Sequence, residues 1–104
     1  MQTITVQELK ERLDKGAAIH LVDVREPSEN AEFNIGGVLL PVGEIRNMQT
    51  EPIDDWKNEE IVLYCRSGNR SGIAAQILEQ MGFENPKNLT GGMLAWQENF
   101  GTGK

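Results

Sequence analysis

The segment from residue 60 to residue 82 constrains the fold more than any other part of the chain. It opens with "EIVLYC" (60–65), a nearly continuous apolar run that is typical of a strand buried on both faces of a parallel sheet. A short loop follows, and "NRSGIAAQILEQMG" (69–82) then has the periodicity of a helix. A buried strand that leads through a loop into a helix is the unit from which parallel α/β sheets are built. The residues predicted to face the sheet from this helix are Ile73, Ala74, Ile77, Leu78 and Met81.

The rest of the chain repeats this alternation. Short strands are predicted at the start of "TITVQELKERLDKG" and in "AIHLVDV", "GGVLLP" and "PKNLTGG". Helices are predicted after Thr5, with Glu8 as its capping-box partner, and in "EPSENAEF", "VGEIRNMQ", "IDDWKN" and "GGMLAWQENF", with Pro52 separating the third and fourth of these five. The pattern predicts an α/β fold whose five strands form a mostly parallel sheet flanked by helices on both faces.

Composition and charge exclude some classes of function. The chain has 104 residues and a net charge of −6, which argues against nucleic acid or an acidic membrane as the main partner. The N-terminal residues have no apolar core of signal-peptide length, and no apolar run approaches the length of a membrane helix. We therefore expect a cytoplasmic protein, in which a free thiol stays reduced.

The loop "CRSGNR" after the central strand holds the only cysteine of the chain. Gly68 can adopt a positive φ, which lets several backbone N–H groups converge into an anion-binding nest. The helix that begins near Asn69 adds its partial positive charge, and Arg66 and Arg70 add full ones. Each effect favours the thiolate of Cys65 and lowers its pKa, so this cysteine is predicted to be reactive rather than structural.

Three segments of the sequence resemble the rhodanese-like sulfurtransferase family. "CRSGNRS" (65–71) resembles the active-site loop of the family, "LVDVREP" (21–27) its D-V-R segment and "LTGGMLAW" (89–96) its L-x-G-G-x-x-A-W ending. They lie in the family's order with family-like spacing and cover nearly the whole chain. The resemblance implies that residues 1–104 form a single rhodanese-like domain, of which 101–104 are a frayed tail.

The resemblance also implies a two-step sulfur transfer. Cys65 would take sulfur from a small anionic donor such as thiosulfate, or from a protein persulfide, and hold it as a persulfide. The acceptor would be cyanide or a thiol, for which a thioredoxin-like protein is one option, and neither a cofactor nor a metal would be required. Arg66 and Arg70 would orient the anionic donor. The loop residues whose amides would cradle the persulfide are Arg66, Ser67, Gly68, Asn69 and Arg70.

Other residues are expected to support the loop. Asp23 and Arg25 end a strand that should lie close to Cys65, and together with Ser71 they are assigned to order the site by hydrogen bonds or charge pairing. His20 is the only histidine and is three residues from Asp23, so the two side chains point to opposite faces of their strand. We therefore expect His20 to pack within the fold rather than to form a catalytic dyad.

Gly91 and Gly92, Trp96 and three of the methionines carry further expectations. Gly91 and Gly92 are expected to permit a close approach to the active loop. The side chains expected in the core or at its rim are Met48, Met81, Met93 and Trp96.

One segment departs from the family pattern E-Y-x-x-G-H-I-P-G-A. In "ENAEFNIGG" (29–37), Asn34 stands in place of the family histidine. An asparagine still forms hydrogen bonds but does not titrate near neutral pH. We expect the fold to tolerate this change.

Two alternatives to sulfur transfer stay open. A phosphatase or arsenate reductase on the same fold would use a similar loop. In rhodanese-related phosphatases, however, five residues lie between the cysteine and the arginine, whereas only four lie between Cys65 and Arg70. The shorter ring suits a sulfur atom better than a phosphoryl group. A non-catalytic interaction module is the second alternative, although inactive rhodanese-like domains commonly lose the cysteine.

Overall fold

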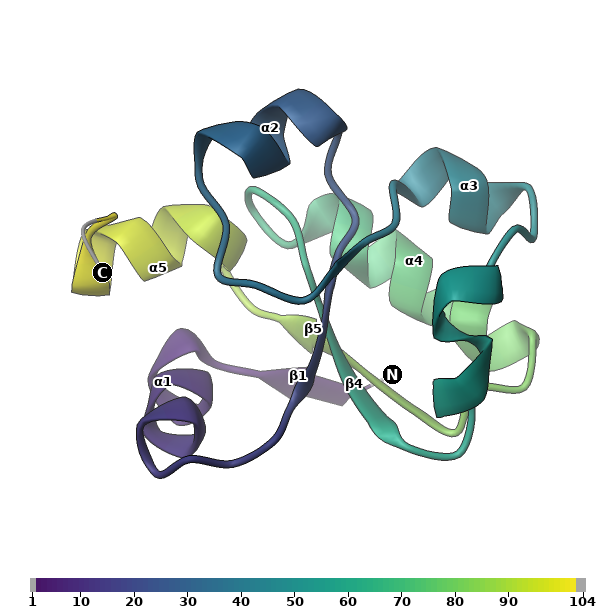
Figure 1. The fold of residues 1–104 in the computed structure, drawn as a ribbon, viewed down its shortest axis with the longest axis horizontal. Helices are drawn as coiled ribbons and strands as arrows, with labels where there is room; N and C mark the ends of the chain where they lie inside the picture. The colour runs from purple at the N-terminus through teal and green to yellow at the C-terminus, as the bar shows by residue number, and fades with distance from the viewer. Residues whose placement is uncertain (1, 103–104) are drawn as a thin grey trace.

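The elements alternate along the chain as the sequence predicts (Figure 1). The computed structural model describes residues 2–102. The elements are β1 (Gln2–Ile4), α1 (Val6–Asp14), β2 (His20–Asp23), α2 (Pro27–Glu32), β3 (Val38–Leu39), α3 (Val42–Arg46), the 3₁₀ helix η1 (Glu51–Trp56), β4 (Glu60–Tyr64), α4 (Asn69–Gln80), β5 (Asn85–Leu89) and α5 (Gly92–Phe100). Of the predicted tail, 101–102 follow α5, whereas 103–104 lie outside the described residues.

The five strands form one sheet in the order β1-β5-β4-β2-β3. Every neighbouring pair is parallel, so the predicted mostly parallel sheet is parallel throughout. The central strand β4 pairs with β2 through Asp23 and Tyr64, and with β5 through Leu63 and Asn88. The carboxyl ends of β2, β4 and β5 therefore meet at one edge of the sheet, and Cys65 follows directly at that edge.

Helices cover both faces of the sheet, as predicted. Along β4, Ile61 and Leu63 face a core shared with α3, η1 and α4, whereas Val62 and Tyr64 face a core shared with α1 and α5. This alternation follows from the period of two residues in a strand. Since both faces are apolar, the "EIVLYC" segment reads as a continuous apolar run.

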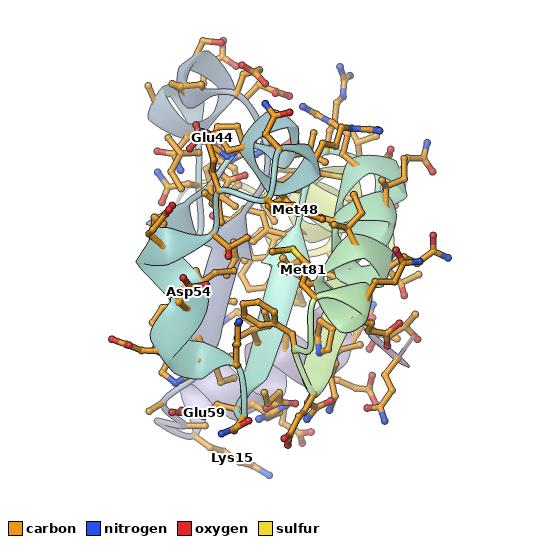
Figure 2. The ribbon with its side chains drawn as sticks, turned by 90° about the vertical axis from the view of Figure 1, so that its right-hand side faces the viewer. Lys15, Glu44, Met48, Asp54, Glu59 and Met81 are labelled. Atoms are coloured by element: carbon orange, nitrogen blue, oxygen red, sulfur yellow. The ribbon has the colours of Figure 1, made fainter. Side chains whose placement is uncertain are left out.

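Two side chains depart from the expected burial. Ile73 is 39% exposed, and Ala75 is buried instead. The reason is that the face of α4 that packs on the sheet carries Ser71, Ala74, Ala75 and Leu78. Met48 is 70% exposed, so the expectation that it packs in the core or at its rim is wrong. It follows α3 in a turn with a φ of 63°, and its side chain lies on the outside of the molecule (Figure 2). The expected position in the core or at its rim is confirmed for Met81, Met93 and Trp96.

The helix predicted at 53–58 also differs, since η1 begins at Glu51 and includes Pro52. Pro52 lies in its first turn. Proline is tolerated there because the first N–H groups of a helix have no partner within the helix. Pro52 thus belongs to the first turn of this helix instead of separating it from α3.

The edge of the sheet opposite Cys65 is held by charged and aromatic contacts. Glu60, the first residue of β4, accepts hydrogen bonds from Nη1 and Nη2 of Arg12 at 2.9 and 2.5 Å and forms an ion pair with Lys87 of β5 at 2.6 Å. His20 stacks on Trp56 with a centroid distance of 4.1 Å, and its Nε2 lies 2.6 Å from Glu59 Oε1. The expectation that His20 packs within the fold is therefore confirmed. Within residues 2–102, every helix is too short or too polar to cross a membrane.

Candidate active site

Cys65 lies between the strand β4 and the loop that leads into α4. The residue is 1% exposed and contributes to the core beside α4. Gly68 is the N-cap of α4 with a φ of 99°, a left-handed conformation that favours glycine. The predicted positive φ and the predicted start of the helix at Asn69 are both confirmed. The tight turn at Gly68 brings the chain back over the cysteine sulfur.

Three donors converge on this sulfur. The Gly68 amide donates to Cys65 Sγ at 3.1 Å, and both the amide and the hydroxyl of Ser71 donate to it at 3.4 Å. Burial favours the neutral thiol, but the hydrogen bonds from Ser71, Gly68 and the Ser67 amide outweigh it and lower the pKa of Cys65 below its ordinary value. The loop therefore favours the thiolate, in the direction that the sequence predicts.

Asn88, at the carboxyl end of β5, is a part of the site that the sequence analysis did not identify. Its Nδ2 donates to the Gly68 carbonyl at 3.1 Å, and its Oδ1 accepts from the Ser71 hydroxyl at 2.5 Å. The Asn88 amide thus joins the turn at Gly68 to the first part of α4. The signal that could have found it is a polar residue just before "LTGG", at the edge where the strands end.

The N-terminus of α5 packs against the loop from the other side. The amides of Met93 and Leu94 donate to the carbonyls of Cys65 and Arg66, both at 2.9 Å. A Cβ atom on Gly92 would lie 2.7 Å from the Arg66 carbonyl oxygen, so only a glycine fits there. The expected close approach is therefore confirmed for Gly92. Because peptide bonds are trans, carbonyls that face α5 turn the following N–H groups away from it and into the loop.

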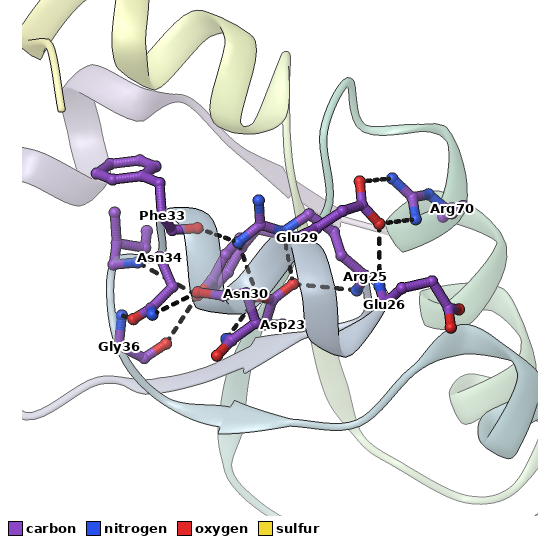
Figure 3. Close-up of polar contacts among 11 residues, drawn as sticks. Asp23, Arg25, Glu26, Glu29, Asn30, Phe33, Asn34, Gly36 and Arg70 are labelled. Carbon is purple, nitrogen blue, oxygen red and sulfur yellow. Dashed lines mark hydrogen bonds and ion pairs between the residues drawn. The ribbon is translucent and has the colours of Figure 1, made fainter.

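Asp23 and Arg25 form a buried ion pair at the same edge of the sheet (Figure 3). Arg25 Nε and Nη2 donate to the two carboxylate oxygens of Asp23 at 2.9 and 2.8 Å. Arg25 also donates to the Phe33 carbonyl at 2.6 Å, and Asn30 donates to Asp23 at 2.8 Å. The pair therefore fixes α2 and the segment after it to the end of β2. These contacts fit a positioning function for the pair.

Arg70 is held in a two-pronged ion pair with Glu29 of α2. Its Nη1 and Nη2 donate to the two carboxylate oxygens of Glu29 at 2.7 and 2.9 Å (Figure 3). This pairing lowers the pKa of Glu29 to about 2. Arg66, in contrast, is exposed and has no ion pair among residues 2–102. Of the two arginines expected to meet an anionic donor, Arg70 is already engaged with a carboxylate.

Asn34, which stands in place of the family histidine, holds a turn. Its Nδ2 donates to the Asn30 carbonyl at 2.9 Å, and its Oδ1 accepts from the Gly36 amide at 2.9 Å. The Tyr64 hydroxyl donates to the Gly36 carbonyl at 2.9 Å, and burial raises the pKa of Tyr64 to about 12. Asn34 and Tyr64, which stay neutral at physiological pH, therefore add to the hold that the Arg25 contact with the Phe33 carbonyl has on the segment after α2.

The fold and the site together define a class of protein. The chain is an α/β protein in which a loop at the carboxyl edge of a parallel sheet directs N–H and O–H donors at one cysteine sulfur. Such a loop can hold a thiolate and can stabilise negative charge on a sulfur bound to it. Within residues 2–102, His, Cys, Asp and Glu side chains form no group of three that could hold a metal ion.

Comparison with known proteins identifies the family. The rhodanese-like domain family matches residues 5–99, and the chain therefore belongs to this family. It is 38% identical over 94 residues to a sulfurtransferase from Allochromatium vinosum, covering 89% of this chain and 85% of the relative. It is 33% identical over 76 residues to the thiosulfate sulfurtransferase PspE from Escherichia coli, covering 72% of each. The crystal structure of a rhodanese-like domain protein from Staphylococcus aureus superposes with a TM-score of 0.79 at 33% identity, covering 92% of this chain and 91% of that one.

Some relatives are longer than this chain. Two matched relatives are covered over only 49% and 24% of their own length. The chain therefore spans only part of these relatives, and what they do as whole proteins does not transfer to it directly. That residues 1–104 form a single domain stays a prediction.

Proposed function

We propose that this chain is a thiosulfate sulfurtransferase of the rhodanese type that carries sulfur as a persulfide on Cys65. The observation that carries the proposal is the convergence of the Gly68 amide and of the Ser71 amide and hydroxyl on Cys65 Sγ. These donors stabilise the thiolate that attacks and the negative charge of the persulfide that forms. The name of the Escherichia coli relative supports thiosulfate as the donor.

The reaction has two steps that share one sulfur atom. The Cys65 thiolate attacks the outer sulfur of thiosulfate, the S–S bond of the donor breaks, and its electron pair leaves on sulfite. The acceptor, cyanide or a thiolate, then attacks the outer sulfur of the persulfide, and the electron pair of that S–S bond returns to Cys65. No general base is required, because the loop already favours the thiolate.

The proposed roles of the other residues follow from their contacts. The amides of the loop residues 66–70 cradle the persulfide, while Arg66 meets the incoming anionic donor. Ser71 and Gly68 hold the sulfur, and the Asp23–Arg25 pair positions α2 beside the loop. A protein persulfide as donor and a thioredoxin-like protein as acceptor are further proposals. We also propose a cytoplasmic location, since the reaction needs a reduced thiol.

Two structural details disfavour a phosphatase or an arsenate reductase. Four residues rather than five separate Cys65 from Arg70, which gives a smaller ring of amides. Arg70 also donates to both carboxylate oxygens of Glu29, whereas binding of a phosphoryl group would need this guanidinium free. Turnover of phosphoesters that depends on Cys65 would support this alternative.

Mass spectrometry of the intact protein tests the proposal. After treatment with thiosulfate we expect a gain of one sulfur atom, about 32 Da, which cyanide removes and which the Cys65→Ser variant does not acquire. If neither thiosulfate nor a persulfide donor adds sulfur, and Cys65 titrates as an ordinary thiol, the chain is an interaction module rather than an enzyme.

A further inference from the structure

A cavity of about 290 Å³ lies beside the Cys65 loop. We call it the Arg66 cavity, and the residues that line it include Arg25, Glu29, Glu32, Arg66, Met93 and Leu94. It is bordered by the loop itself, by α2 and by the N-terminus of α5. An anionic donor that approaches the loop from this side meets the charges of these three elements.

The positive charges around the Arg66 cavity are balanced by carboxylates. Arg25 is paired with Asp23, and Arg70 is paired with Glu29, so neither offers a free cation. Arg66 has no ion pair among the described residues, but Glu32 lines the same cavity. The three negative charges at or next to the cavity, on Asp23, Glu29 and Glu32, equal in number the three positive charges, on Arg25, Arg66 and Arg70. The cavity therefore lacks the excess positive charge that attracts a dianion.

Glu29 is fixed in place by more than its ion pair. Its Oε1 accepts from the Glu26 amide at 3.0 Å, which is the capping-box contact at the start of α2. The hydrogen bonds from Arg70 lower the pKa of Glu29 to about 2, so the carboxylate is charged at neutral pH. The ion pair, whose side chains are only about a third exposed, therefore neutralises Arg70 at neutral pH.

We propose that Glu29 is a specificity-determining residue, which neutralises Arg70 and thereby limits the advantage that thiosulfate, with two negative charges, has over sulfur donors with one. The inference rests on the proposed function, because it presupposes sulfur transfer to Cys65. A carboxylate near the donor repels a dianion about twice as strongly as a monoanion. Removing its charge is therefore expected to favour a doubly charged donor by roughly five- to tenfold over a singly charged one.

Thiosulfate and methanethiosulfonate form a matched pair of probes. Both present a terminal sulfur to Cys65, but thiosulfate carries two negative charges and methanethiosulfonate carries one. In each case the thiolate attacks the terminal sulfur, and the electron pair of the broken S–S bond leaves on sulfite or on methanesulfinate. The ratio of the two rate constants for persulfide formation reports the charge preference and cancels any general loss of Cys65 reactivity.

Three variants form a charge cycle. Glu29→Gln retains one oxygen that can accept from the Glu26 amide and from Arg70 Nη1, whereas its amide nitrogen loses the bond from Arg70 Nη2. We expect it to raise the thiosulfate-to-methanethiosulfonate ratio roughly five- to tenfold. Arg70→Gln leaves Glu29 unneutralised and is expected to lower the ratio. The double variant restores the original net charge and should return the ratio close to that of the unmodified protein. Glu84→Gln, at the opposite edge of the sheet, is the control and should change nothing.

The outcomes separate this inference from the proposed function. If both donors react but the ratio moves in neither single variant, Glu29 has no part in donor specificity and the inference is overturned. If Glu29→Gln does not fold, the expected fall in the Arg70→Gln ratio decides the matter, and its absence overturns the inference. If no persulfide forms from either donor on the unmodified protein, the proposed function itself fails.

Discussion

Ser71 has one hydroxyl proton and two acceptors for it. Its Oγ lies 3.4 Å from Cys65 Sγ and 2.5 Å from Asn88 Oδ1. Because Asn88 Nδ2 donates to the Gly68 carbonyl, the amide oxygen of Asn88 has to face Ser71 as an acceptor. The proton can turn toward the sulfur when Cys65 ionises and toward Asn88 when the sulfur carries its own proton. The charge state of Cys65 thus decides whether the Ser71 hydroxyl donates to the sulfur or to Asn88 of β5.

Removing this hydroxyl is expected to make Cys65 less acidic. In Ser71→Ala the sulfur keeps its amide donors but loses the hydroxyl, so we expect the pKa of Cys65 to rise. The measurement is the rate of alkylation by iodoacetamide as a function of pH. Ser67→Ala is the matched control, since this exposed serine acts on the sulfur through its amide alone. Equal alkylation profiles for the two variants would show that the Ser71 hydroxyl has no effect.

Local residues of the site could be predicted from the sequence, whereas long-range partners could not. Cys65, Gly68 and the start of α4 follow one another in the chain, and strand, turn and helix signals indicate their arrangement directly. The partner of Arg70 lies 41 positions away on a different helix, and nothing in the spacing of charges identifies Glu29 among the acidic residues. Asn88 was missed for the same reason, because its contact depends on the pairing of β4 with β5.

At the scale of elements, the start of α5 and the Cys65 loop depend on each other. The helix supplies two N–H groups to loop carbonyls, and these contacts require close approach at Gly92, whose φ is 56°. A side chain at this position would overlap the loop backbone and would also strain the left-handed conformation. The loop is therefore shaped by α5 as well as by α4.

Gly92→Ala is expected to damage both stability and reactivity. We expect the free energy of unfolding to fall by about 2 kcal/mol or more, and thiosulfate-dependent persulfide formation to fall with it, because the Cys65 and Arg66 carbonyls must move. Urea unfolding and intact-protein mass spectrometry give the two measurements. Gly43→Ala is the control, since a Cβ atom there meets nothing within 4 Å and the position is in a helix. The same loss in both variants would contradict the explanation.

Most elements could be predicted because their signals are local, and the exceptions have physical causes. The capping box of Thr5 and Glu8 forms as expected and starts α1. The exposure of Ile73 could not be foreseen, because two adjacent faces of α4 are both apolar and only the packing against the sheet selects one. Met48 is exposed because of the direction that the chain takes in the turn after α3. The few residues of this short helix carry no sequence pattern from which that direction could be predicted.

At the scale of the whole molecule, buried or partly buried carboxylates make stability depend on pH. Arg12 and Lys87 lower the pKa of Glu60 to about 2 from an ordinary value of 4.5, and Arg70 does the same for Glu29. The unfolded chain takes up these protons near pH 4.5, and the folded chain does so only near pH 2. The stabilisation is therefore complete above pH 4.5 and is lost as the pH falls toward 2.

Glu60→Gln isolates one of these contributions. We expect the variant to be less stable at pH 7 by on the order of 1 kcal/mol, a value that allows for screening of a partly exposed group. The difference from the unmodified protein should shrink as the pH falls toward 2 and vanish below it, because folded Glu60 becomes protonated as the pH passes through 2. Urea unfolding at a series of pH values measures this convergence. Glu11→Gln, which removes an exposed pair with Lys15, should follow the unmodified protein throughout.

The contact between α5 and the Cys65 loop also sets the time at which the site is completed during protein synthesis. Residues 60–71 leave the ribosome before residues 92–94, whose amides hold the loop carbonyls. The first strand waits as well, because within residues 2–102 the only pairing partner of β1 is β5. A nascent chain that ends before α5 therefore carries Cys65 without the two amides that hold the loop carbonyls. We expect the Cys65 loop to reach its final shape only after α5 has been made.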